Sequence, residues 1–321
     1  MLILSAADVE ALLPMDVAIA AVRTAMVQVS EGQAVLPLRH FLDVPGSDGG
    51  KLVVMPGAMA SPHVFGVKTV AKYNHPPGSP FGSHVGTVQL FDAATGLLLA
   101  IIEGSSLTSI RTAAASALAT DVLARSDARV LAVLGTGEQA RRHVAAMRAV
   151  RDIDEVRIWG RTPDFAAALA ADVGGRACTR VAEAVAGADI ICTTTAAKTP
   201  ILFGKDVPAG AHVNLVGAPV RTSAEADGAL VARAEFFVDY KVAAAAAAGE
   251  LLDAIETGLV GADHARGEIG EVILGRVAGR LGPEAVTVYK SLGVTAQDLT
   301  AAVAVLEAAR AAGRGTALEL V

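Results

Sequence analysis

The chain has 321 residues, of which 53% are hydrophobic and 19% are charged, so it can bury the cores of two domains and is not expected to be disordered. Its net charge of −6 offers no basic stripe for a nucleic-acid partner, and no apolar run is long enough to predict a membrane span. The start lacks the basic segment of a secretory signal, and the two cysteines, Cys178 and Cys192, lack metal-ligand spacing, so we expect a cytoplasmic protein with reduced, buried cysteines and no metal site.

The first third of the chain predicts helices followed by a sheet. Ser5 has the position of an N-cap, and helical periodicity continues to about residue 30. Residues 34–103 predict strands and turns, with a hairpin turn at 92–96. A helix of small residues follows over 107–124.

From residue 130 onward, short apolar runs alternate with helical patterns. This βαβ alternation predicts a parallel sheet. After Thr295 the chain predicts a strongly periodic helix, which could return to pack on the first part of the chain and make the first domain discontinuous. The predicted elements of the alternating part are residues 130–134, 138–150, 155–159, 163–172, 180–186, 188–194, 212–217 and 235–239.

The turn after the first of these strands has the Gly-x-Gly-x-x-Ala pattern of a dinucleotide-binding unit. It reads Gly135-Thr136-Gly137-Glu138-Gln139-Ala140. The first glycine permits the tight turn, the second lets a pyrophosphate approach the backbone, and the free N–H groups of the following helix face the phosphates. The strand–turn–helix context favours this interpretation over an ordinary tight turn.

The end of the second strand indicates which nucleotide is bound. The strand ends at Trp159-Gly160-Arg161-Thr162, without the carboxylate that accepts a hydrogen bond from the ribose of NAD. Arg161 could pair with a 2′-phosphate, and Thr162 adds a hydroxyl donor. We therefore expect NADPH, with NADH less favoured, although Arg161 could instead be a solvated surface charge.

Three motifs make the chain resemble the ornithine cyclodeaminase/mu-crystallin family over essentially its whole length. They are residues 107–114 (LTSIRTAA), residues 135–140 (GTGEQA) and residues 290–293 (KSLG). The resemblance implies an α/β fold, with a Rossmann dinucleotide-binding domain at 118–295 and a discontinuous α+β domain at 1–117 with 296–321. The latter would bind substrate and form a homodimer.

The resemblance also carries site residues over to this chain. It implies that Arg39, Lys68 and Arg111 bind a substrate carboxylate. Of these we expect Lys68 and Arg111 to be catalytic, with Lys68 also handling a proton. Leu292 is a further substrate-binding position. The implied cofactor-binding residues outside the two glycine-containing segments are Ser83, Arg111, Thr112, Thr195, Val216, Gly217 and Ser291.

One departure from the family bears on the reaction. The resemblance implies an aspartate for cyclodeaminases at the position of Pro219, and proline has neither a titratable group nor an N–H donor. We therefore expect an NADPH-dependent imine (ketimine) reductase that converts a 2-imino acid to an L-amino acid. The substrate could be cyclic or open-chain. The alternatives are a cyclodeaminase or amino-acid dehydrogenase, and a crystallin-like NADPH-binding protein without turnover.

Overall fold

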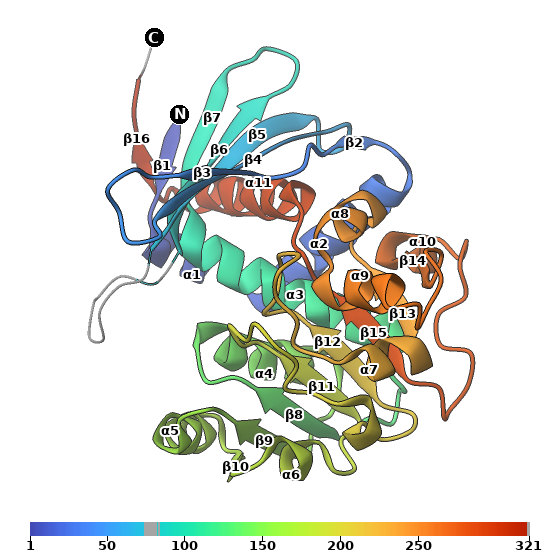
Figure 1. The fold of residues 1–321 in the computed structure, drawn as a ribbon. Coiled ribbons are helices and arrows are strands. Elements are labelled where there is room, and N and C mark those ends of the chain that lie inside the picture. The colour runs from blue at the N-terminus through green and yellow to red at the C-terminus, as the bar shows by residue number, and fades with distance from the viewer. Residues whose placement is uncertain (74–81, 83, 320–321) are drawn as a thin grey trace. The chain divides into compact units, whose positions relative to one another are not determined.

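The computed structural model describes residues 1–73, 82 and 84–319, and its chain divides into two compact units (Figure 1). Unit 1 comprises residues 1–111 with 294–321, and unit 2 comprises residues 112–293. The chain passes from unit 1 to unit 2 within helix α3 (Gly104–Leu123), and it returns at the start of helix α11 (Thr295–Ala312).

Unit 1 contains an eight-stranded sheet in the order β16-β1-β7-β6-β5-β4-β2, with β3 paired to β4. Neighbouring strands are antiparallel except β1 and β7. Along β4 and β5 every second residue is buried, so one face of the sheet belongs to the core. The strands are β1 (Leu2–Leu4), β2 (Ala34–Val35), β3 (His40–Asp43), β4 (Lys51–Met59), β5 (Val64–Lys72), β6 (His84–Asp92), β7 (Leu98–Glu103) and β16 (Thr316–Ala317).

Three helices accompany this sheet: α1 (Ala6–Leu12), α2 (Met15–Ser30) and α11. Helix α11 packs against α2 and against β4, β5 and β6, as expected for a returning C-terminal helix (Figure 1). Close packing requires glycine at Gly66, where a Cβ atom would collide with the backbone of Gln89 and with Leu299 of α11. The predicted N-cap is confirmed, because the Ser5 side chain accepts the Asp8 N–H.

Unit 2 contains the predicted parallel sheet. Its strand order is β10-β9-β8-β11-β12-β15-β13-β14, and every neighbouring pair is parallel. The carboxyl ends of all eight strands therefore lie along one edge, where ligands bind in open α/β sheets. The strands are β8 (Val130–Leu134), β9 (Glu155–Trp159), β10 (Arg176–Cys178), β11 (Ile190–Thr193), β12 (His212–Leu215), β13 (Glu235–Val238), β14 (Ala265–Glu268) and β15 (Thr287–Lys290).

Short helices connect these strands and complete the core of unit 2. Apolar side chains from alternate positions of the strands, such as Leu134, Val213 and Val288, pack with Leu230 and Leu251 of the helices. The predicted burial of both cysteines is confirmed, and both are free. The helices are α4 (Glu138–Val150), α5 (Pro163–Val173), α6 (Val181–Val185), η1 (Gly204–Asp206), α7 (Gly228–Arg233), α8 (Lys241–Ala247), α9 (Gly249–Glu256) and α10 (Ile269–Ile273).

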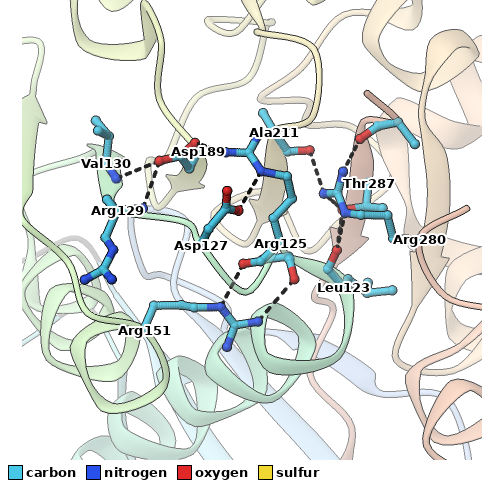
Figure 2. Close-up of polar contacts among 12 residues, drawn as sticks. Leu123, Arg125, Asp127, Arg129, Val130, Arg151, Asp189, Ala211, Arg280 and Thr287 are labelled. Atoms are coloured by element: carbon cyan, nitrogen blue, oxygen red, sulfur yellow. Dashed lines mark hydrogen bonds and ion pairs between the residues drawn. The ribbon is translucent and has the colours of Figure 1, made fainter. Parts of the chain in front are cut away.

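A carboxylate clamp lies at the amino ends of β8 and β11 (Figure 2). Asp189 accepts the backbone N–H groups of Arg129 and Val130 on one oxygen, at 2.8 and 2.9 Å. Its other oxygen lies 2.6 Å from Nη2 of Arg125. The clamp therefore fixes where β8 begins, at the sheet edge opposite the carboxyl ends.

Two further arginines hold the last turn of α3 (Figure 2). The guanidinium of Arg151 donates to the carbonyls of Thr120, Asp121 and Ala124, each at 3.1 Å. Arg280 donates through Nε to the Leu123 carbonyl at 2.8 Å. These donors add hydrogen bonds to carbonyl groups at the end of the helix, of which Thr120 also accepts the N–H of Ala124.

Several short elements were not predicted from the sequence. Strands β1, β10 and β16 have only two or three residues, too few for a recognisable period, and they form because distant strands offer edges to pair with.

Among the described helices no single one is long and apolar enough to cross a membrane. The bent pair α1 and α2, at 89°, meets that test by length and composition only.

Candidate active site

Two predicted substrate-binding cations meet one buried carboxylate in unit 1. Lys68 lies on β5 and Arg111 on α3, and both contact Oδ1 of Asp298 on α11. Lys68 Nζ is 3.0 Å and Arg111 Nε is 2.9 Å from that oxygen. Each of the three side chains is at most 5% exposed. Arg111 also donates through Nη1 to Oε1 of Gln297 at 2.8 Å.

Burial and charge set the protonation states of this cluster. Burial lowers the pKa of Lys68 to about 8, with Asp298 opposing the fall and Arg111 and Arg39 adding to it. Burial alone would raise the pKa of Asp298, but Arg111 and Lys68 outweigh it and lower that pKa. Asp298 therefore stays ionised, while Lys68 can give up its proton near neutral pH.

The cluster has the surplus of positive charge that an anionic ligand requires. Arg39 precedes β3, is half-buried, and affects the pKa of Lys68 by its charge, so it belongs to the same region. Oδ2 of Asp298 and Nε2 of Gln297 are buried without a hydrogen-bond partner among the described residues. Three cations with one carboxylate can bind a carboxylate ligand. Nε2 of Gln297 could donate to that carboxylate, and Oδ2 of Asp298 could accept from an N–H group of the same ligand.

Sequence reasoning found the cations of this cluster but missed Asp298 and Gln297. The two lie side by side on a helix whose other residues are mostly alanine, valine and leucine, and both are fully buried. Two adjacent polar residues within such a periodic apolar helix were a signal that could have drawn attention to them.

The predicted phosphate-binding turn lies at the carboxyl end of β8 in unit 2. Gly135 has φ +141°, a conformation that L side chains rarely adopt, and a Cβ atom there would collide with Thr194. Gly137 is the N-cap of α4, has no side-chain cap, and faces open space at its Cβ position. The uncapped N–H groups of α4 and the open space above Gly137 fit a pyrophosphate.

The segment after β9 lies at the same edge of the sheet. A Cβ atom on Gly160 would collide with the methyl group of Thr136, so glycine brings this segment against the phosphate-binding turn. Arg161 is exposed, and its side chain forms no ion pair with any described residue. Thr162 is the N-cap of α5, and its hydroxyl caps nothing. Both side chains can therefore reach a ligand.

The remaining cofactor positions follow β11, β12 and β15. Ser291 donates its N–H to Leu215, and Val216 donates its own to Thr193. Thr195 and Gly217 both donate to the buried Glu225, for which the sequence predicted no role.

The remaining predicted site residues are Leu292, Thr112 and Ser83. Leu292 is buried in unit 2 and donates its N–H to Asp239 at 2.8 Å. Thr112 lies on α3, as the first residue of unit 2. Ser83 lies outside the described residues.

Comparison with known proteins identifies the family. The chain matches the model of the ornithine cyclodeaminase/mu-crystallin family over residues 1–313. It is 40% identical over 274 residues to ketimine reductase mu-crystallin of Mus musculus, which covers 85% of this chain and 84% of the relative. The chain belongs to the ornithine cyclodeaminase/mu-crystallin family. The resemblance inferred from the three motifs is thereby confirmed.

Similarity within this family extends over full-length chains. The protein is 35% identical over 328 aligned positions to the Δ1-pyrroline-2-carboxylate reductase of Bacillus thuringiensis subsp. konkukian, covering 99% of this chain and 100% of the relative. A solved structure of the Thermococcus litoralis Δ1-pyrroline-2-carboxylate reductase, in complex with NADH and L-proline, superposes with a TM-score of 0.94. It is 30% identical and covers 99% of this chain and 100% of that chain. The predicted fold class is confirmed, with a Rossmann sheet in unit 2 and an α+β arrangement in unit 1.

Proposed function

We propose that this protein reduces the C=N bond of a 2-imino acid to give an L-amino acid, with NADPH as the hydride donor. The observation that carries the proposal is the buried cluster of Lys68, Arg111 and Asp298, which combines an anion-binding charge with a lysine of lowered pKa. Relatives named ketimine reductase and Δ1-pyrroline-2-carboxylate reductase support the same reaction.

Unit 1 binds the imino acid in this proposal. Arg111 and Arg39 pair with its α-carboxylate, and the side chains of α11 hold Arg111 in place. Reduction adds a hydride to the imine carbon and requires that the nitrogen carry a proton. Lys68, with its pKa lowered to about 8, supplies that proton to an unprotonated imine, or stabilises the carboxylate of an iminium.

Unit 2 binds the nucleotide, which supplies the hydride when bound. The uncapped start of α4 and the Gly135–Gly137 turn receive the pyrophosphate. The preference for NADPH over NADH rests on Arg161, an exposed guanidinium that no described carboxylate neutralises, next to Gly160, where an NAD-dependent chain would have an acidic residue. Thr195, Val216, Gly217 and Ser291 would lie toward the nicotinamide.

The preferred substrates are cyclic imines such as pyrroline-2-carboxylate and piperideine-2-carboxylate, with open-chain imines of 2-oxo acids as the second choice. Either class has the single α-carboxylate that the cluster can pair with. We further propose that the protein is a cytoplasmic homodimer assembled through unit 1. Pro219 disfavours the cyclodeaminase reaction, because it offers no group to hold a second amine.

The test is consumption of NADPH by the purified protein with each imine, with the amino acid identified by chiral chromatography. We expect stoichiometric loss of NADPH and formation of the L-enantiomer. Lys68→Met should cost about 2–5 kcal/mol of transition-state stabilisation while NADPH still binds. Turnover of ornithine to proline with catalytic nucleotide, or no turnover of any 2-imino acid, would contradict the proposal.

A further inference from the structure

Glu225 is a buried carboxylate in unit 2 whose two oxygens are fully occupied. Oε1 accepts the backbone N–H and the hydroxyl of Thr195, both at 2.7 Å. Oε2 accepts the Thr193 hydroxyl at 2.7 Å and the Gly217 N–H at 2.6 Å. The residue has no exposed surface. Four short hydrogen bonds to one carboxylate fix its position closely, because each oxygen is held by one backbone donor and one hydroxyl.

The groups that Glu225 holds come from two neighbouring strands. Thr193 ends β11 and Thr195 follows it, whereas Gly217 lies two residues beyond the end of β12. A Cβ atom on Gly217 would collide with the backbone of Thr195 and come within 2.6 Å of Glu225 Oε1. The two strand ends are therefore packed against each other with Glu225 as their common acceptor.

A buried ion pair also holds the backbone of Glu225 in place. Lys290, the last residue of β15, contacts Glu250 at 2.9 Å and donates to the carbonyl of Ala218 at 2.7 Å. Glu250 in turn accepts the backbone N–H of Glu225 at 2.9 Å. Burial raises the pKa of Glu225, and the charge of Lys290 and the hydrogen bonds from Thr195 and Thr193 oppose that rise. Lys290 thus offsets the cost of a charge at a site that excludes water.

We propose that Glu225 is a positioning residue that fixes the two strand ends against which the nicotinamide half of the nucleotide binds. The proposal rests on the proposed function, since it assumes a nucleotide at the carboxyl edge of the sheet. Glu225 itself is enclosed and touches neither substrate nor nucleotide. Its effect passes through Thr195 and Gly217, whose backbone it holds in one conformation.

Binding of the adenosine half of the nucleotide should not depend on Glu225. Its expected ligands, the Gly135–Gly137 turn and Arg161, follow β8 and β9. Within the described part of the chain, none of the four donors to Glu225 comes from either segment. Weakening the hydrogen bonds to Glu225 should therefore weaken binding of the nicotinamide half and leave binding of the adenosine half unchanged.

The experiment compares two ligands on the full-length protein carrying Glu225→Gln. Calorimetry gives the Kd for NADPH and for adenosine 2′,5′-bisphosphate, which lacks the nicotinamide half. The amide replaces one acceptor oxygen by a donor that faces a backbone N–H and a hydroxyl. We expect the Kd for NADPH to rise about tenfold and the Kd for the bisphosphate to change less than about twofold. The kcat should fall about 100-fold, with little change in KM for the imine. Glu225→Asp, which keeps the charge, should recover part of both losses.

Asp189→Asn is the matched control. Asp189 holds two backbone N–H groups and an arginine at the opposite edge of the same sheet (Figure 2). This variant should lower Tm without changing the ratio of the two Kd values. Thr193→Val removes one of the four donors with little change of shape, and it should shift the ratio in the same direction as Glu225→Gln but by less.

The outcomes separate this inference from the proposed function. Equal weakening of both ligands in Glu225→Gln, as a general loss of stability would produce, overturns the positioning role. So does an unchanged ratio in Thr193→Val, which keeps the test decisive if Glu225→Gln does not fold. Failure of the unsubstituted protein to bind NADPH or reduce any imine would instead overturn the proposed function.

Discussion

Asp298 contacts Lys68 and Arg111, the two fully buried cations of the substrate cluster, through a single carboxylate oxygen. Removing its charge would leave Lys68 and Arg111 buried beside each other without a counter-charge. Asp298 therefore stabilises the protonated form of buried Lys68, because its charge raises the pKa of Lys68 against the effect of burial.

The first prediction follows from that electrostatic role. A proton donor must be protonated, so the rate should fall as pH rises through the pKa of Lys68, about 8. Asp298→Asn removes a contribution that raises this pKa, so the alkaline fall should begin at a lower pH. A pH profile of kcat/KM measures the shift. Asp8→Asn, which affects only the cap of α1, should leave the profile in place, and an unshifted or upward-shifted profile in Asp298→Asn would contradict the role assigned to Lys68.

The second prediction concerns the nucleotide. Arg161→Ala should weaken NADPH binding by about 1.5–3 kcal/mol and leave NADH binding nearly unchanged, because only NADPH has a 2′-phosphate to pair with. Fluorescence titration with both nucleotides measures the difference. Arg180→Ala, another exposed arginine of unit 2 next to a helix start, serves as the control. Tighter binding of NADH than of NADPH by the unsubstituted protein would refute the preference.

Among single residues, the sequence reveals those whose role depends on their neighbours in the chain. The Gly135–Gly137 turn and Arg161 are readable because strand, turn and helix follow one another in the chain. The roles of Asp298 and Glu225 are not, because their partners come from elsewhere: Asp298 is 230 positions from Lys68. A hydrogen-bond network that closes only on folding leaves no spacing pattern in the sequence.

Among the elements, α3 has both ends held by side chains from outside the helix. At its start the Glu103 carboxylate accepts the N–H groups of Ser105 and Ser106, at 2.6 and 2.9 Å. At its end Arg151 and Arg280 take up the last carbonyls (Figure 2). The helix carries Arg111, so these caps help to fix a residue of the substrate cluster.

The third prediction tests the C-terminal cap of α3. Arg151→Ala removes the side-chain donor from the carbonyls of Thr120, Asp121 and Ala124, of which Thr120 keeps the N–H of Ala124. It should lower the free energy of unfolding by about 2–3 kcal/mol. Urea denaturation measures this loss. Because Arg151 lies at the amino edge of the unit 2 sheet, the Kd for NADPH should not change. Arg148→Ala, a basic residue in the last turn of α4, is the control, and equal losses in both variants would contradict the capping role.

Element lengths determine how far the sequence could predict the fold. Helices α4 and α5 and the five-residue strands β8 and β9 have a clear period and were predicted within one or two residues of their observed bounds, whereas α3 begins three residues before its predicted start. Helices α7 to α10 and strands β14 and β15 have only four to eight residues, and tertiary pairing rather than local propensity determines them.

For the whole molecule, the exposed apolar residues of unit 1 bear on assembly. Four of them lie around β2 and β3, where Val35 is 68% and Leu42 is 60% exposed, with Leu38 and Phe41 between them. An exposed apolar group of this kind on a short, sheet-edge segment is typical of a surface that a partner covers.

The fourth prediction is that a second copy covers it. Light scattering should give twice the 32.5 kDa of one chain, and Phe41→Glu should shift the mass toward a single chain because a carboxylate cannot be buried unpaired at an apolar interface. Leu259→Glu, at an exposed leucine of unit 2, should leave the mass unchanged. A single-chain mass for the unsubstituted protein at micromolar concentration would refute the dimer.

The split of unit 1 into two separated stretches has a consequence for synthesis on the ribosome. Unit 2 is one continuous stretch, residues 112–293, so its parallel sheet can form as soon as it leaves the exit tunnel. Unit 1 cannot be completed at that stage, because α11 is translated only after the whole of unit 2. Until α11 has been synthesised, the sheet of unit 1 has an uncovered apolar face. Lys68 and Arg111 also lack Asp298, the carboxylate that neutralises them. Unit 1 is thus begun before unit 2 and completed after it, and nascent chains should depend most on chaperones during that interval.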